Sequence, residues 1–338
     1  MKRILVIAPS WVGDCMLMQP MLMRLRQRHP DAQIDVFAPP WTAALLRLLP
    51  EVHEVLINPF PHGALQFLKR RRLGKKLRDN HYDQAVVLPN SFKSALLPFF
   101  AGIPLRTGFI GEMRYGLLND VRVLDKKALP LMVERFMQLA EAPNLEISRP
   151  VPQPRLQVDN AQREQVLHRL GLSLNQPVAA LCPGAEFGPA KRWPITYFAE
   201  LAQQLRDRGH AVWLIGSARD REIADWIVSL GNGVCNNLCG RTDLAEAVAL
   251  LACADIVVSN DSGLMHLAAA LDRPMIALYG SSSPDFTPPL SAKARILKLD
   301  LPCSPCFKRE CPLGHFNCMK QLTPGMVAKY LPEVTRES

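Results

Sequence analysis

Short apolar runs of strand length alternate with amphipathic segments of helix length along most of this chain. This alternation is typical of βαβ units, in which consecutive strands are parallel and a helix crosses over between them. In the first half we expect strands at 4–8, 34–38, 52–57, 84–88 and 106–109, and helices at 15–28, 42–49, 65–78, 91–100 and 129–142. The pattern therefore predicts an α/β fold with doubly wound parallel sheets.

A proline-rich stretch of little periodicity interrupts the alternation between residues 143 and 158. Such a stretch is typical of a semi-rigid linker between domains. Beyond it we expect strands at 178–182, 211–215, 234–237, 254–258 and 274–279, and helices at 161–170, 194–208, 219–230, 244–253 and 262–271. We predict a first domain at 1–150, a linker at 151–175, a second domain at 176–322, and a helix within 323–338 that packs back on the first domain.

The polar motifs of both predicted domains directly follow predicted strands. In doubly wound sheets, ligands bind beyond the carboxyl ends of the strands. We therefore expect two Rossmann-like domains that face each other across a cleft, with the motifs converging on it.

The charge of the chain favours an anionic partner. Its 40 Lys and Arg exceed its 31 Asp and Glu, a net charge of +9,. Seven basic residues lie within 69–78, among them Lys69, Arg70, Arg71 and Arg72. A solvated helix face explains this run as well as contact with an anionic membrane, a phosphorylated substrate or nucleic acid. Nucleic acid is the weaker alternative, because stacking aromatic side chains are not interleaved with the run.

The sequence contains no apolar run of 18 residues, so we expect no transmembrane helix,. The apolar segment at 4–8 is too short for a signal peptide and is interpreted as a first core strand,. We therefore expect a cytosolic protein.

The stretch 259–266 joins a predicted buried strand to a helix. Unpaired N–H groups at a helix N-terminus, together with the helix dipole, favour a phosphate or diphosphate. Gly263 lets an anion approach the backbone, Ser262 is placed to cap the helix, and His266 lies in the first turn. Asp261 repels phosphate and fits the hydroxyls of a sugar better. An ordinary N-cap is the alternative interpretation.

The loop 183–194 delivers Lys191 just before a helix that Pro194 can start,. A lysine there suits a diphosphate whose negative charge grows as it leaves. The alternative is a surface lysine packed beside Trp193.

The first predicted strand ends in a loop that carries Gly13 and Asp14. It lacks the GxGxxG pattern of dinucleotide-binding proteins, so we do not expect NAD. Asp14 is interpreted either as a helix cap or as a general base that removes a proton from an acceptor hydroxyl.

Two weaker motifs follow later strands. In the segment 216–222, Asp220 or Glu222 is placed to hold ribose hydroxyls of a nucleotide,. In the loop 240–243, backbone groups are placed along the edge of an adenine.

Together these segments resemble the ADP-heptose:lipopolysaccharide heptosyltransferases, and most closely those that add the second heptose. The resemblance spans nearly the whole chain and is carried by residues 9–14, 88–94, 108–118, 183–194, 260–266 and 279–289. It implies a GT-B glycosyltransferase whose second domain binds ADP-heptose and whose first domain binds heptosyl-Kdo2-lipid A. The implied reaction is transfer, with inversion, to the first heptose of the inner core. The alternative is a sibling that adds the first or third heptose.

The resemblance also implies residue roles. The catalytic residues are Asp14 as base and Lys191 on the donor phosphate. The donor-binding residues are Gly184, Glu186, Phe187, Lys191, Asp220 (ribose), Thr242 (adenine), Asp261 (heptose), Ser262, Gly263 and His266 (phosphates). The acceptor-binding residues are Ser10, Trp11, Gly13, Asn90, Lys93 and Arg114, with Lys69, Arg70, Arg71 and Arg72 for acceptor phosphates or the membrane.

No cofactor and no catalytic metal are implied. The implied partners are ADP-heptose, the lipid A-core acceptor and the anionic inner-membrane surface of a Gram-negative bacterium, at its cytoplasmic side, and we expect a monomer that does not bind nucleic acid. A non-catalytic sugar-nucleotide binder on the same fold is a further alternative, because fold does not determine activity.

Cysteines cluster near the C-terminus, with one histidine among them: Cys303, Cys306, Cys311, His315 and Cys318. The first pair has zinc-site spacing, whereas the later spacing departs from a second CxxC. The sequence favours free thiols or a redox-sensitive pair and leaves a structural zinc as the alternative. Of the other cysteines, those in apolar contexts are interpreted as buried thiols.

Overall fold

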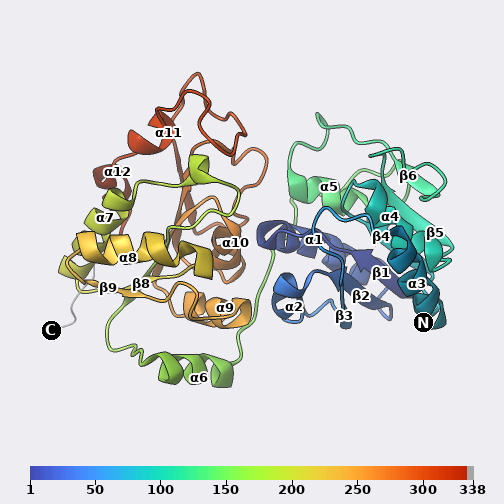
Figure 1. The fold of residues 1–338 in the computed structure, drawn as a ribbon, viewed down its shortest axis with the longest axis horizontal. Coiled ribbons are helices and arrows are strands. Elements are labelled where there is room, and N and C mark those ends of the chain that lie inside the picture. The colour runs from blue at the N-terminus through green and yellow to red at the C-terminus, as the bar shows by residue number, and fades with distance from the viewer. Residues whose placement is uncertain (333–338) are drawn as a thin grey trace. The chain divides into compact units, whose positions relative to one another are not determined.

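A computed structural model describes residues 1–332, which form two compact units that divide between Pro154 and Arg155 (Figure 1). The expected linker at 151–175 contains helix α6 (Asn160–Leu170), which packs against α9 (Leu244–Ala252) of the second unit. Val166 and Leu167 on α6 are buried. Residues 155–175 are therefore part of the second unit, and 151–154 belong to the first.

The first unit contains a six-stranded parallel sheet in the order β3-β2-β1-β4-β5-β6. Its strands are β1 (Arg3–Ile7), β2 (Gln33–Ala38), β3 (Glu54–Ile57), β4 (Gln84–Val87), β5 (Leu105–Phe109) and β6 (Asp120–Arg122). The central strands read as continuous apolar runs because helices cover both faces of the sheet. The doubly wound fold expected from the sequence is confirmed for this unit.

Two groups of helices cover this sheet (Figure 1). The first group is α1 (Val12–Arg28), α2 (Pro40–Leu46) and α5 (Met132–Gln138), and the second is α3 (Phe67–Lys76) with α4 (Phe92–Phe100). In the second group, a Cβ at Gly74 would lie 2.6 Å from the Cβ of Phe100. Glycine at this position therefore allows the close approach of α3 to α4.

The second unit repeats this topology. Its six-stranded parallel sheet has the order β12-β11-β10-β7-β8-β9. Its strands are β7 (Val178–Cys182), β8 (Ala211–Leu214), β9 (Cys235–Asn237), β10 (Ile256–Asn260), β11 (Met275–Tyr279) and β12 (Ala294–Lys298). Read in chain order from β7, this is the Rossmann order 3-2-1-4-5-6, the same as in the first unit.

The helices of the second unit also form two groups. On one face, α7 (Ile195–Asp207) packs against α8 (Arg221–Leu230) and α12 (Pro324–Ala328), and on the other α9 packs against α6 and α10 (Gly263–Ala270). Short helices η1 (Leu77–Asn80), η2 (Pro189–Lys191), η3 (Ala218–Asp220) and α11 (Asn317–Lys320) complete the two units.

The described part of the last segment, residues 323–332, packs within the second unit. The prediction placed a helix within 323–338 against the first domain. In the structure α12 contacts α7, and Val327 and Leu331 belong to the hydrophobic core of the second unit. Their burial there is the physical reason for the difference. The part of the predicted helix beyond residue 332 lies outside the described residues.

Strand order reverses at one place in each sheet, between β1 and β4 in the first unit and between β7 and β10 in the second. The loops that leave neighbouring strands at such a switch point diverge to opposite faces, which opens a crevice for ligands. These two switch points locate the candidate sites of the two units.

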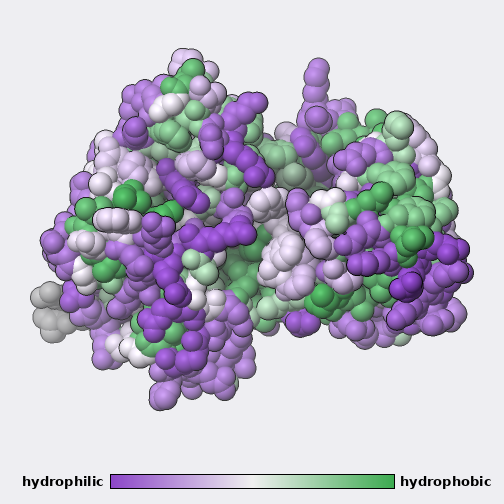
Figure 2. Space-filling model, viewed as in Figure 1, coloured by the Kyte–Doolittle hydropathy of each residue, from purple (hydrophilic) through white to green (hydrophobic). Residues whose placement is uncertain are grey.

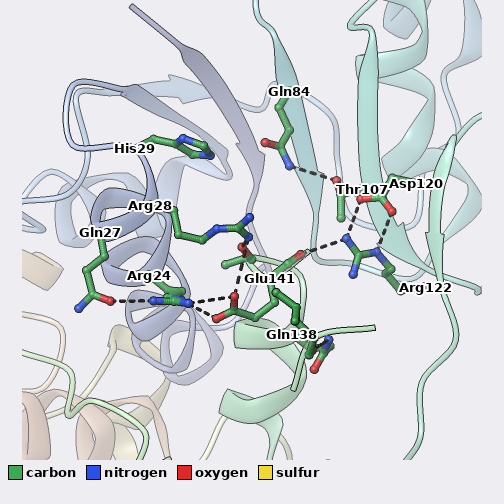
Figure 3. A network of polar contacts seen from close by, with 12 residues as sticks. Arg24, Gln27, Arg28, His29, Gln84, Thr107, Asp120, Arg122, Gln138 and Glu141 are labelled. Carbon is green, nitrogen blue, oxygen red and sulfur yellow. Dashed lines mark hydrogen bonds and ion pairs between the residues drawn. The ribbon is translucent and has the colours of Figure 1, made fainter. Parts of the chain in front are cut away.

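A polar network fixes α1 within the first unit (Figure 3). Buried Glu141 accepts hydrogen bonds from Arg24 of α1 and forms an ion pair with Arg28, while its backbone oxygen accepts from Arg122 of β6. Arg122 also pairs with Asp120 at 2.7 Å. The C-terminal half of α1 is thus tied to the segment after α5 and to the sheet edge, which fixes the orientation of the helix that carries Asp14.

No helix within residues 1–332 has the length and apolar character that crossing a membrane requires.

Candidate functional site

Asn260 joins the two loops at the switch point of the second unit. Its side chain is fully buried at the end of β10, where its Nδ2 donates to the carbonyl of Pro183 at 2.8 Å and its Oδ1 accepts from the backbone N–H of Trp193 at 3.0 Å. The loop after β7 is therefore held at both ends by one side chain from β10. This clamp sets the position of Lys191 within the loop.

Lys191 and Asp261 form an ion pair at this switch point. Lys191 ends the short helix η2, and its Nζ lies 2.5 Å from Oδ2 of Asp261, the residue directly after β10. The hydroxyl of Ser282 donates to the same carboxylate oxygen, and the ammonium also lies 5.0 Å from the ring centroid of Phe187. The sequence singled out Lys191 and Asp261 separately. The structure shows them as direct partners.

The N-terminus of α10 is available to an anion. Ser262 occupies the N-cap position with extended backbone, as predicted, but within the described residues its side chain makes no capping hydrogen bond. Its hydroxyl instead lies 3.3 Å from that of Ser259. The N–H groups of the first turn, beginning at Gly263, therefore lack a side-chain acceptor at the cap, which suits a phosphate.

His266 is a neutral imidazole beneath this helix N-terminus. The residue is 6% exposed, and burial lowers its pKa from 6.5 to about 4. Asp261 acts against this shift, and Lys191 adds to it. At neutral pH His266 can therefore donate or accept a hydrogen bond but adds no charge to the site.

The depressed pKa of His266 predicts a loss of stability at acidic pH. Between about pH 6.5 and 4 the unfolded chain binds a proton at this residue that the folded chain does not, so lowering the pH favours unfolding,. We expect His266 to account for about 2 kcal/mol of lost unfolding free energy between pH 7 and pH 5. Urea denaturation, followed by tryptophan fluorescence at both pH values, measures this loss of unfolding free energy. The loss between pH 7 and pH 5 should be smaller by about 2 kcal/mol in His266→Gln. It should stay unchanged in His168→Gln, a variant of an exposed histidine on α6. Equal pH dependence in wild type and His266→Gln would refute the prediction.

Gly184 and Asp220 lie against each other. The Asp220 carboxylate accepts hydrogen bonds from the backbone N–H and the hydroxyl of Ser217, at 2.9 and 2.8 Å, and both go to Oδ2. A Cβ at Gly184 would lie 2.5 Å from this carboxyl group. Because of this close approach of Asp220, residue 184 must be a glycine. The hydrogen bonds that Asp220 accepts from Ser217 close the turn at η3.

The remaining predicted donor residues surround this region. Glu186 forms an exposed ion pair with Arg219 of η3. The backbone N–H of Gly240 donates to the carbonyl of Gly216 at 3.0 Å, which brings the loop carrying Thr242 beside the loop carrying Asp220. The loops after β7, β8 and β10 are therefore linked by side-chain contacts. The loop that carries Thr242 joins them through this backbone bond and through Arg221, whose guanidinium donates to the carbonyl of Gly240 at 3.2 Å.

The first unit has a pocket of about 310 Å³ at its own switch point. It is lined by Pro9, Ser10, Trp11, Asp14, His62, Leu88, Pro89, Asn90, Phe109, Leu124, Met132, Arg135 and Phe136. Four predicted acceptor or catalytic residues thus line one cavity: Ser10, Trp11, Asp14 and Asn90. Among residues 1–332, the lining includes neither Gly13 of α1 nor Lys93 of α4.

Asp14 reaches this pocket from the first turn of α1, which begins at Val12. The loop before it is held by Trp41, whose indole N–H donates to the Ser10 carbonyl at 2.9 Å. A carboxylate placed beside a mostly apolar pocket is suited to accept a proton from a bound hydroxyl.

Arg114, predicted as an acceptor ligand, is not among the residues that line this pocket. Its guanidinium is buried and donates to the carbonyls of Pro89 and Phe109, each at 2.5 Å, and to Oδ1 of Asn90 at 3.2 Å. Burial lowers its pKa to about 10, so it stays charged at neutral pH. Nη1 and Nη2 of Arg114 therefore position the loop that carries Asn90, whereas its buried Nε has no hydrogen-bond partner within the described residues.

Arg70 likewise departs from its prediction as a surface cation. It is buried on α3, where it donates to the carbonyls of Leu65 and Ala64 and lies 4.0 Å from the ring centroid of Phe60. Lys69, Arg71 and Arg72 are exposed as expected. Figure 2 shows a hydrophilic surface over α3, and two apolar side chains of the same helix, Phe67 and Leu68, are also exposed.

The sequence missed several lining groups. His62 and the α5 residues Met132, Arg135 and Phe136 reach the first-unit pocket from segments that carry no recognisable motif. Ser282 was missed as the second partner of Asp261. Its position after β11, at the carboxyl edge of a parallel sheet, was the signal that could have found it.

Comparisons with known proteins agree on one family. The model of glycosyltransferase family 9 (heptosyltransferase) matches residues 70–317. The chain is 51% identical to lipopolysaccharide heptosyltransferase 2 of Escherichia coli strain K12 (97% of each chain) and 50% identical to that of Salmonella typhimurium (99% of each chain). The solved structure of E. coli ADP-heptose lps heptosyltransferase II is similar with a TM-score of 0.88 and 49% identity, over 98% of this chain and 97% of that one.

Proposed function

This chain belongs to glycosyltransferase family 9, the heptosyltransferases, and on that premise we propose that it transfers heptose from ADP-heptose to the first heptose of the lipopolysaccharide inner core. The expected fold class is confirmed: each unit is a Rossmann-like α/β domain of the GT-B kind. The observation that carries the proposal is the pairing of Lys191 with Asp261 next to the uncapped N-terminus of α10.

The second unit holds the donor in this proposal. The diphosphate accepts hydrogen bonds from the first-turn N–H groups at Ser262 and Gly263 and from Lys191, which Asp261 keeps in place,. Neutral His266 lies near the phosphates and, because it is uncharged, does not repel the ammonium of Lys191. Asp220 and the loop of Thr242 hold the ribose and the adenine, and Asp261 also accepts from heptose hydroxyls.

The first unit holds the acceptor in its pocket, with Asp14 as the base. Asp14 removes the proton of the acceptor hydroxyl while that oxygen bonds to the anomeric carbon of the heptose from the face opposite ADP. The carbon–oxygen bond to the diphosphate breaks, and its electron pair leaves with ADP. Lys191 and the α10 N-terminus stabilise the charge that develops on the leaving group, and the configuration at the anomeric carbon inverts.

A product assay tests this function directly. The purified chain is incubated with ADP-heptose and, separately, with lipid acceptors that end in Kdo, in one heptose or in two heptoses. We expect a mass gain of one heptose, with release of ADP, on the acceptor that ends in one heptose. Transfer only to one of the other acceptors would assign the chain to a sibling activity, and no transfer to any of them would contradict the proposal.

We also propose that α3 docks the enzyme on the anionic cytoplasmic surface of the inner membrane, where its lipid acceptor lies. Lys69, Arg71 and Arg72 are exposed, and Leu68 beside them is 74% exposed. Cations near an anionic leaflet contribute about 1 kcal/mol each, and exposed apolar side chains can enter the headgroup region.

Vesicle binding checks this docking surface. On vesicles rich in phosphatidylglycerol, we expect Arg71→Gln/Arg72→Gln to lose about 2 kcal/mol, roughly 30-fold in affinity. The matched control, Arg206→Gln/Lys329→Gln, removes two exposed charges from the second unit and should bind as wild type does. Equal binding of the two double variants would exclude α3 as the docking surface.

A further inference from the structure

Four cysteines of the second unit line one small pocket that the proposed transferase mechanism does not use. They are Cys303, Cys306, Cys311 and Cys318, in the loop before α11 and in α11 itself, coloured orange to red in Figure 1. All cysteines of the chain lie within the described residues, and all are free thiols there. The sequence spacing showed only that these cysteines are close along the chain, whereas the structure shows that all four line one pocket.

A buried hydroxyl without a partner faces the same pocket. Ser281 is 1% exposed and lines the pocket, and within the described residues its Oγ has no hydrogen-bond partner. Buried polar atoms are nearly always satisfied, so an unsatisfied one indicates an unfilled polar or ionic position. This observation is independent of the thiols and points to the same place.

The backbone around Cys311 is arranged to support a thiolate. The N–H of Phe316 donates to Sγ of Cys311 at 3.4 Å. Cysteine binds metal ions as the thiolate, so hydrogen bonds of this kind favour a ligand role.

The histidine of the cluster, His315, forms a hydrogen bond with the backbone. Nδ1 of His315 accepts the backbone N–H of Asn317 at 3.0 Å, so the proton of the neutral ring lies on Nε2,. A ring in this tautomer does not offer Nε2 to a metal. The donor set is therefore composed of sulfur alone.

The four thiols are neighbours but do not touch. All four cysteines line the same pocket. In the described part of the chain no three of the sulfur atoms lie within 4.8 Å of one another. A shared ion therefore requires these side chains to rotate to other staggered conformations.

The loop that carries three of the cysteines, residues 303–316, is hydrogen-bonded to the segments that position Lys191 and Asp261. The carbonyl of Arg309 accepts the N–H of Ala190 at 3.0 Å, and a Cβ at Gly188 would lie 2.4 Å from that oxygen. On the other side, the N–H of Phe307 donates to the carbonyl of Ser281, next to Ser282. A crosslink within the loop would therefore restrain both members of the donor-site ion pair.

We propose that Cys303, Cys306, Cys311 and Cys318 bind one thiophilic divalent ion, zinc or ferrous iron, in a structural site that braces the Lys191 loop. Sulfur-only tetrahedral sites select these ions. Each thiol that enters as a thiolate releases one proton, and no bond is oxidised or reduced. The ion is structural because the donor phosphates are held by other groups. The restraint on Lys191 rests on the proposed function, whereas the metal site itself does not.

Metal analysis of the full chain tests the site. After purification without chelators or a metal-binding tag, we expect about one zinc or iron per chain by inductively coupled plasma mass spectrometry. Cys306→Ser and Cys311→Ser should lose the ion, and Cys253→Ser, a half-buried cysteine outside the pocket, should retain it. Metal-free protein titrated with Co²⁺ should develop the intense visible absorption of a tetrahedral cobalt thiolate. Circular dichroism of each variant confirms that it is folded.

Three results would overturn the proposal. These are a chain without stoichiometric metal that also fails to take up Zn²⁺ or Co²⁺, a Cys306→Ser variant that keeps the ion, and a disulfide between two of the four cysteines in the protein as isolated. A chain that carries the full metal content but transfers no heptose would contradict the proposed function and not the metal site.

Discussion

Replacing Asp14 with asparagine is expected to reduce kcat by about 10²- to 10⁴-fold, the range typical of lost general-base catalysis. Asparagine keeps the shape of the side chain in the first turn of α1 but cannot accept the proton of the acceptor hydroxyl. The change lies in the first unit, so the affinity for ADP-heptose should stay within about twofold. Steady-state kinetics with a lipid acceptor that ends in one heptose, together with calorimetric titration of ADP, measure both quantities.

Asp31→Asn is the matched control for this variant, because it makes the same substitution at an exposed carboxylate just beyond α1. It should retain wild-type turnover. A pH profile adds a readout that a structural role would not change: the acidic limb of kcat/KM should disappear in Asp14→Asn. If that variant turned over at the wild-type rate, another group would be the base.

Replacing Lys191 with methionine is expected to lower kcat by about 10²- to 10³-fold, or roughly 3–4 kcal/mol of transition-state stabilisation. Methionine keeps the apolar stem against Phe187 and removes the ammonium that would neutralise the leaving diphosphate. ADP affinity should fall as well, because ADP carries the same diphosphate. The control Lys293→Met removes an exposed lysine that also pairs with an aspartate, Asp272, and should leave turnover unchanged.

The ion pair with Asp261 gives this variant a second effect that must be separated from catalysis. Lys191→Met leaves a buried carboxylate whose remaining donor is Ser282, which costs stability,. The double variant Lys191→Met/Asp261→Asn removes the uncompensated charge, so unfolding free energy should recover while turnover does not. Recovery of turnover with stability would show that Lys191 acts only by folding the loop.

The central strands were predictable because they are buried on both faces and bounded by polar or glycine-rich loops. The expected strand 178–182 and β7 (Val178–Cys182) coincide. Two edge strands were missed, β6 (Asp120–Arg122) and β12 (Ala294–Lys298). Both are short or rich in basic residues, because an edge strand is only partly covered and needs no continuous apolar run.

The candidate site was predictable where a motif follows a strand of the sheet. Lys191 and Asp261 lie in segments that follow switch-point strands, and Asp14 lies in the first turn of the helix after such a strand. These positions follow from topology. Roles that depend on packing were not predictable. Nothing in the run 69–72 distinguishes buried Arg70 from exposed Arg71. Nothing local indicates that Nη1 and Nη2 of Arg114 donate to the carbonyls of Pro89 and Phe109.

The most direct test of the central claim is a crystal structure of the full chain with ADP-heptose bound. The account predicts the diphosphate at the N-terminus of α10, within hydrogen-bond distance of the Gly263 N–H and the Nζ of Lys191. A diphosphate bound elsewhere on the chain, with the Lys191–Asp261 pair and the first turn of α10 unoccupied, would contradict it.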